Sequence, residues 1–220
     1  MKHFLICLII FTLIGAAQAQ DDLQKAILSN DQGVAEYEAK NYETASKLFE
    51  QAIGLHSKYA TAYYNLGTTY INLKQFEKAL SSFEKAVEIH PRYAESYNQM
   101  GVAYAETGRY DRAIEALRRS VSLKGHNPMA LRNLGFAYMQ TEKFKPAINA
   151  LKQAVLFDAD NADIRVLLGY ALSREKEYDE AIAEIRRAAQ LEPENKEVQF
   201  FLGNLYLAVR DKPAALAQHA

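Results

Sequence analysis

Glycine recurs in this chain at a fixed interval of 34 residues, and an alanine follows each of these glycines twelve positions later. The glycines are Gly33, Gly67, Gly101, Gly135, Gly169 and Gly203, and the alanines are Ala45, Ala79, Ala113, Ala147, Ala181 and Ala215. A strict period of this length, without insertion or deletion, is typical of a solenoid in which one helical hairpin is stacked many times. The function of such a chain is therefore to be sought on the surface of the stack.

The second repeat, residues 60–93, shows how one unit is built. Two sets of side chains follow helical spacing, the first being Tyr63, Leu66, Gly67 and Tyr70 and the second Phe76, Ala79, Phe83 and Ala86. The mainly polar stretch 72–75 between them predicts a turn, and Pro91 predicts the end of the second helix. Small side chains at Gly67 and Ala79 allow the two helices to approach closely.

These residues carry a resemblance to a known family. An aromatic residue, Leu-Gly, Tyr, Ala, Phe and Pro follow in the order of the tetratricopeptide repeat, with Tyr63 in place of the usual tryptophan. The predicted units are residues 26–59, 60–93, 94–127, 128–161 and 162–195, with a partial unit at 196–220. The resemblance implies an all-α, right-handed superhelical solenoid of antiparallel helix-turn-helix repeats, about five and a half units long.

The two terminal units depart from this pattern. Gln32 and Glu36 replace the expected Leu and Tyr in the first unit, as is typical of a terminal repeat with one face in water. In the last unit a second helix is predicted to begin near Pro213, and His219 stands where the second unit has Phe83. We expect either that the natural chain is longer or that another surface covers this end.

Residues 1–19 have the pattern of a secretory signal peptide, with a basic start, an apolar run over residues 4–14 and an Ala-x-Ala cleavage pattern at residues 17–19. The prediction is an exported chain that begins at Gln20, in a bacterial periplasm or secreted, with no membrane insertion after cleavage. An uncleaved anchor is the alternative, although the run is shorter than the ~20 residues that span a bilayer. The only cysteine, Cys7, lies in this segment, so the mature chain has no disulfide.

Composition and motifs argue against nucleic-acid binding and against catalysis. The 26 Lys and Arg residues are balanced by 27 Asp and Glu residues, which leaves no basic excess. The histidines are isolated, and no HExxH motif, phosphate-binding glycine loop or nucleophile motif occurs. The sequence therefore predicts a protein that is not an enzyme and that has no catalytic residue, metal site or cofactor.

Residues that differ between units are the candidates for binding. The resemblance implies that the first helix of each unit lines a concave groove, which its second, fifth, ninth and twelfth positions face. The predicted partner-binding residues are Tyr64, Asn65, Asn98, Val102, Arg132, Asn133, Phe136, Met139, Val166, Tyr170, Phe200 and Asn204. This surface is polar in the early units, and apolar and aromatic from Phe136 to Phe200, which favours peptide docking in the later units.

Structural interpretations of these residues stay open. Phe136, Tyr170 and Phe200 could pack between neighbouring first helices, because large apolar residues prefer burial. The asparagines could bond a peptide backbone or could be ordinary surface residues. The Lys, Asn and Arg clamp with which cytosolic co-chaperones of the family hold a carboxylate is absent, and Arg132 is the one cation on the stripe.

The predicted function is a non-catalytic scaffold that binds a protein or peptide partner in the groove, as an assembly or accessory factor of the cell envelope. One alternative is a structural module that self-associates through its uncapped C-terminal end. Another is the non-catalytic part of a longer protein. The identity of the partner does not follow from the sequence.

Overall fold

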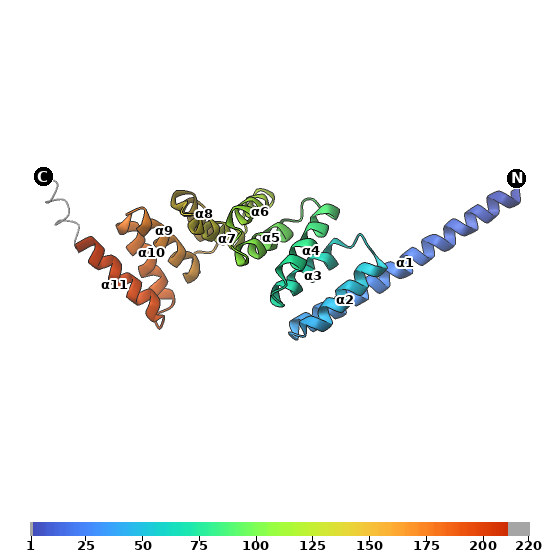
Figure 1. The fold of residues 1–220 in the computed structure, drawn as a ribbon, viewed down its shortest axis with the longest axis horizontal. Coiled ribbons are helices and arrows are strands. Elements are labelled where there is room, and N and C mark those ends of the chain that lie inside the picture. Colours follow the sequence, from blue (N-terminus) through green and yellow to red (C-terminus); the bar gives the residue numbers. More distant parts are fainter. Residues whose placement is uncertain (1, 211–220) are drawn as a thin grey trace. The chain divides into compact units, whose positions relative to one another are not determined.

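The computed structural model describes residues 2–210, with side chains from residue 18 to residue 209, and the described chain consists of helices joined by short turns and loops (Figure 1). Its helices are α1 (Lys2–Glu38), α2 (Tyr42–Leu55), α3 (Ala60–Asn72), α4 (Phe76–Ile89), α5 (Ala94–Glu106), α6 (Tyr110–Leu123), α7 (Pro128–Gln140), α8 (Phe144–Phe157), α9 (Ala162–Arg174), α10 (Tyr178–Leu191) and α11 (Lys196–Arg210). From α2 to α10 the helices alternate between 14 and 13 residues. The all-α helical-repeat fold predicted from the sequence is confirmed.

The chain forms two compact units, of which the first extends to Ala103 and the second begins at Tyr104. In the first unit, α2 packs against both α1 and α3, and α4 packs against α3. In the second unit the chain of contacts runs from α6 through α7, α8, α9 and α10 to α11. The first helices of neighbouring repeats also meet directly, α1 with α3 in one unit and α7 with α9 in the other. A face of first helices is therefore present within each unit.

The repeated glycines lie where the two helices of a hairpin cross. A Cβ atom built at Gly67 would lie 2.5 Å from the ring of Phe83, and one built at Gly135 would lie 2.5 Å from the side chain of Leu151. Both neighbours are fully buried. Glycine is required because no larger side chain fits between the first and second helices. At Gly203 the built Cβ meets no described residue within 4 Å.

The turn of each described hairpin contains one residue whose backbone is in the left-handed region. Lys40, Lys74, Glu142 and Lys176 have φ between 56° and 64°, and Gly108 has φ of 72°. After Lys74, the Gln75 amide donates to the Tyr70 carbonyl at 2.8 Å, and the Lys74 amide donates to the Ile71 carbonyl at 2.9 Å. This pair of bonds is the Schellman motif, in which glycine is the favoured residue.

We expect that Lys74→Gly raises the free energy of unfolding by about 1 kcal/mol, because a side chain in the left-handed region costs about that much. Gly108 provides the matched control in the same motif, since Gly108→Ala should lower stability by a similar amount. Urea-induced unfolding followed by circular dichroism measures both changes. A stability loss in Lys74→Gly would show that the lysine side chain contributes more than its backbone conformation costs.

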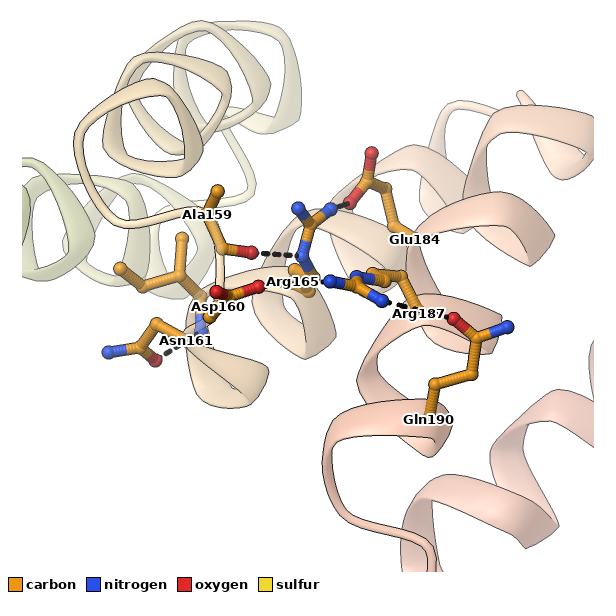
Figure 2. Close-up of polar contacts among 8 residues, drawn as sticks. Ala159, Asp160, Asn161, Arg165, Glu184, Arg187 and Gln190 are labelled. Atoms are coloured by element: carbon orange, nitrogen blue, oxygen red, sulfur yellow. Dashed lines mark hydrogen bonds and ion pairs between the residues drawn. The ribbon is translucent and has the colours of Figure 1, made fainter.

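A polar cluster joins α9, α10 and the loop before α9 (Figure 2). The Arg165 guanidinium forms an ion pair with Glu184 and donates through Nε to the Ala159 carbonyl at 2.8 Å. Arg187 donates to Asp160 at 3.0 Å, and the Asn161 side chain accepts from the Ile164 amide at 3.2 Å and so caps α9. Arg165 and Glu184 have only 12% and 24% of their side-chain area exposed. This cluster joins the loop at the end of one repeat to both helices of the next repeat.

Several predictions about the chain ends stay predictions. The expected cleavage point after Ala19 falls within α1, whose later part packs against α2. The second helix expected near Pro213 and the residues Ala215 and His219 lie outside the described residues. Among the helices of the described chain, none combines the length and apolar character needed to cross a membrane.

Candidate functional site

The predicted partner-binding residues all lie on first helices of repeats. Most of the predicted apolar residues are half-buried, as are Asn65, Asn98 and Asn133. Three residues are exposed: Tyr170, Phe200 and Asn204. The predicted residues are distributed as Tyr64 and Asn65 on α3, Asn98 and Val102 on α5, Arg132, Asn133, Phe136 and Met139 on α7, Val166 and Tyr170 on α9, and Phe200 and Asn204 on α11. Two pockets on this surface gather part of the set, one in each compact unit.

The pocket in the first unit, called here the early pocket, has a volume of about 360 Å³. Its lining residues are Val34, Tyr37, Glu38, Phe49, Tyr64, Asn65 and Thr68, from α1, α2 and α3. The Tyr37 hydroxyl accepts a hydrogen bond from Nδ2 of Asn72 at 2.9 Å, and burial raises the pKa of Tyr37 above its ordinary value. The phenol is therefore neutral at physiological pH, and the pocket offers polar hydroxyl groups beside one carboxylate, that of Glu38.

The pocket in the second unit, called here the late pocket, has a volume of about 520 Å³. It is lined by Met139, Gln140, Glu142, Phe144, Val166, Leu167, Tyr170, Arg174 and Phe201. These residues come from α7, the turn that follows it, the start of α8, α9 and α11. The lining is mainly apolar and aromatic with one cation, a composition common in sites that bind a side chain or a small ligand.

The two pockets use the same positions of the repeat. Five pairs of lining residues are separated by 102 residues, which is three repeats of 34: Tyr37 and Met139, Glu38 and Gln140, Tyr64 and Val166, Asn65 and Leu167, and Thr68 and Tyr170. In both units, the C-terminal end of the first helix of one repeat and the middle of the first helix of the next repeat therefore contribute to a pocket. Hydroxyl, amide and carboxylate groups in the early pocket are replaced by mostly apolar side chains in the late one.

Arg174 lines the late pocket and lies close to two aromatic rings. The Arg174 guanidinium carbon lies 4.5 Å from the ring centroid of Phe144 and 5.9 Å from that of Tyr170. Its Nη1 donates to the Tyr170 hydroxyl at 3.1 Å. The Tyr170 ring also lies 6.3 Å from the ring of Phe201. Stacking and the hydrogen bond hold the guanidinium in one orientation.

Three of the predicted polar residues, Asn65, Arg132 and Asn133, already have hydrogen-bond partners within the fold. Asn65 donates through Nδ2 to Oδ1 of Asn30 at 2.9 Å, and Asn30 is buried between α1 and α3. Arg132 donates to Oδ1 of Asn133 at 3.3 Å. Arg132 lines neither pocket. The hydrogen bond from Asn65 to Asn30 connects neighbouring repeats, so at least part of the bonding capacity of Asn65 is structural.

The structure separates the late aromatic residues that the sequence grouped together. Tyr170 lines the late pocket and is 40% exposed, and Met139 and Val166 lie beside it. Phe136 is half-buried and does not line the pocket. Phe200 is 72% exposed among the described residues, so packing between first helices does not account for it. Whether these residues bind a partner stays a prediction.

The residues predicted from the sequence include Met139, Val166 and Tyr170 of the late pocket, but not its six other lining residues, Gln140, Glu142, Phe144, Leu167, Arg174 and Phe201. Leu167 and Phe201 occupy the sixth position of their repeats, and Arg174 occupies the thirteenth position of its repeat. The sixth position was already represented by Asn65 and Asn133, so adding it throughout would have found Leu167 and Phe201. Arg174 could not be found from the stripe, because its place depends on contacts with Phe144 and Tyr170.

Potential metal ligands are scattered over the described residues. Within the part of the chain that the structure describes, no three His, Cys, Asp or Glu residues are gathered as a metal site requires. The pockets themselves contain carboxylates, an arginine, amides and hydroxyl groups. These groups can form hydrogen bonds with the backbone and the polar side chains of a peptide.

Comparisons with known structures find the same fold. PilF of Pseudomonas aeruginosa is 19% identical, with a TM-score of 0.76 over 90% of this chain and 90% of that one. MamA of Desulfovibrio magneticus RS-1 is 20% identical, with a TM-score of 0.71 over 78% and 97%. YrrB, a TPR protein with an unusual peptide-binding site, is 19% identical, with a TM-score of 0.68 over 82% and 93%. At these identities the likeness concerns the fold.

Models of a known protein family match most of this chain. No curated protein sequence matches the chain. Three models of the tetratricopeptide repeat match it, the first at residues 24–91 and 58–126, the second at residues 104–171 and the third at residues 162–205. Together these matches extend over the same hairpins that the 34-residue period predicts. The chain therefore belongs to the tetratricopeptide repeat family.

Proposed function

We propose that this protein is a non-catalytic scaffold that binds a peptide segment of a partner protein on the face of its first helices. The observation that carries the proposal is the late pocket, where Met139, Val166 and Tyr170 line one cavity and Tyr170 remains exposed. An exposed aromatic side chain beside an apolar cavity is a favourable binding centre, because it buries a large area with few rotatable bonds. The peptide-binding site of the structurally similar YrrB supports the same class of function.

The proposal is tested with peptides selected from a random display library on the wild-type chain. Tyr170→Ala should weaken the Kd of a selected peptide at least about 10-fold, as expected for removal of a central aromatic anchor. Leu156→Ala is the matched control, because Leu156 is an exposed apolar residue of α8 that does not line the pocket. An unchanged Kd in Tyr170→Ala, with circular dichroism like that of wild type, would contradict docking in this pocket.

Export and a role as an assembly or accessory factor of the cell envelope belong to the same proposal. They rest on the signal-like pattern of residues 1–19. Fractionation of the producing cells, with N-terminal sequencing of the purified protein, tests them. A mature chain that starts at Gln20 in the periplasmic or secreted fraction would support export. A chain that starts at Met1 in the cytoplasmic fraction would contradict it.

A second candidate function is self-association through α11. Among the described residues, Phe200, Tyr206 and Leu207 leave large apolar side chains exposed on this last described helix. Burial of such a surface against a second copy would be favourable. Sedimentation equilibrium over a concentration series, with Leu207→Glu as the disrupting variant, distinguishes this function from that of a monomeric peptide binder. A monomer at every concentration contradicts self-association.

A further inference from the structure

The late pocket combines an apolar cavity with one oriented cation. Met139, Val166, Leu167 and Phe201 supply apolar walls, and Arg174 stands beside them. No other described repeat has a basic residue at the equivalent position, which is occupied by Glu38, Asn72, Glu106, Gln140 and Ala208. The cation is therefore a property of this pocket and is not required by the repeat.

The Arg174 side chain is positioned before any ligand arrives. The Phe144 ring lies 4.5 Å from its guanidinium carbon, and the Tyr170 hydroxyl accepts from Nη1 at 3.1 Å. A guanidinium has five N–H donors, so the hydrogen bond to Tyr170 leaves most of its capacity unused. Arg174 is exposed, but these contacts restrain its guanidinium, so binding of an anion costs less side-chain entropy than it would for an arginine without them.

Neither Glu175, the next residue in sequence, nor Glu142, which lines the same pocket, forms an ion pair with Arg174 among the described residues. Glu175 lies 4.0 Å from the Lys145 ammonium group. A cation beside an apolar cavity, without an acidic partner of its own, is complementary to a ligand that carries an apolar group next to a carboxylate.

We propose that the late pocket binds an extended peptide segment in which a large apolar side chain is followed or preceded within two residues by Asp or Glu. The apolar side chain fills the cavity between α7 and α9, and the carboxylate accepts hydrogen bonds from Arg174. This inference rests on the proposed function and adds the chemistry of the partner. We place the carboxylate on a side chain inside the segment, because the clamp of several Lys, Asn and Arg residues that holds a free chain end is absent and the late pocket contains one cation.

The test selects peptides from a random 12-residue library displayed with its C-terminus joined to the coat protein. Selections are run on the full chain and on Arg174→Gln. The control is Lys176→Gln, which removes a nearby exposed positive charge that does not line the pocket. Wild type and Lys176→Gln should both enrich Asp or Glu within two residues of Leu, Phe, Met or Trp. Arg174→Gln should keep the apolar preference and lose the acidic one.

Binding of a selected peptide gives the quantitative outcome. Replacing its acidic residue with the matching amide should weaken binding to wild type about 10-fold, as for loss of one hydrogen-bonded charge pair, and should not change binding to Arg174→Gln. Apolar enrichment without acidic enrichment, or selection only from a library with free C-termini, overturns this inference and leaves the proposed function intact. No enriched peptide in any selection overturns both.

Discussion

Replacement of Gly67 by leucine is expected to lower the free energy of unfolding by about 3 kcal/mol. A Cβ atom at this position would lie 2.5 Å from the Phe83 ring, far inside contact distance. Phe83 has no exposed surface, so its ring has no solvent-filled space into which it can move. The hairpin must therefore open or distort its second helix, and the cost exceeds the ~1 kcal/mol gained from the better helix propensity of leucine.

Gly203→Leu is the matched control, because Gly203 occupies the same position of the last repeat. No described residue lies within 4 Å of a Cβ built there. Stability should stay unchanged or rise by up to about 1 kcal/mol from helix propensity alone. Urea unfolding of both variants gives the comparison. A similar loss in the two variants would show that glycine at this position serves the helix backbone rather than the contact with the second helix.

The second large effect is expected at the ion pair of Arg165 and Glu184, shown in Figure 2. Arg165→Leu should lower the free energy of unfolding by about 2 kcal/mol, because the Glu184 carboxylate then stays three-quarters buried without its charge partner. Thermal or urea unfolding measures the loss. The nearby pair of Arg187 and Asp160 is more exposed and should contribute much less to stability.

Addition of Glu184→Ala should restore most of this loss. The repeat that precedes it has Leu131 and Ala150 at the same two positions, and both are buried there. The double variant therefore copies an arrangement that the fold already uses, and apolar replacement of a buried ion pair is often neutral or stabilising. If the double variant is as unstable as Arg165→Leu alone, the loss comes from the hydrogen bond between Arg165 and the Ala159 carbonyl.

The sequence predicted the fold well because packing repeats in this chain. Residues 72–75 were expected to form a turn, and α3 ends at Asn72 while α4 begins at Phe76. Pro91 was expected to follow the end of a helix, and α4 ends at Ile89. These boundaries depend on spacing and on the chemistry of single residues, both of which can be read from a linear pattern. The left-handed lysines at the turns left no such signal.

The site was harder to predict because its side chains do not repeat. The stripe of first-helix positions found Met139, Val166 and Tyr170, whose backbone places them on the correct face. The same stripe also predicted Arg132 as a binding residue, and its side chain donates to the neighbouring Asn133. The importance of Arg174, at the end of α9, depends on a stacking contact with Phe144 from the preceding helix, α8. Such contacts between long side chains follow from tertiary packing, which periodicity does not encode.

The two pockets use equivalent positions 102 residues apart, and this bears on how the sequence of a repeat protein can evolve. Duplication of a 34-residue segment copies the backbone positions that form a pocket, together with the glycine and alanine contacts that support them. The lining side chains can then diverge while the hairpin beneath them is retained. Tyr64, Asn65 and Thr68 on α3 and Val166, Leu167 and Tyr170 on α9 show how different the linings on equivalent backbone positions can be.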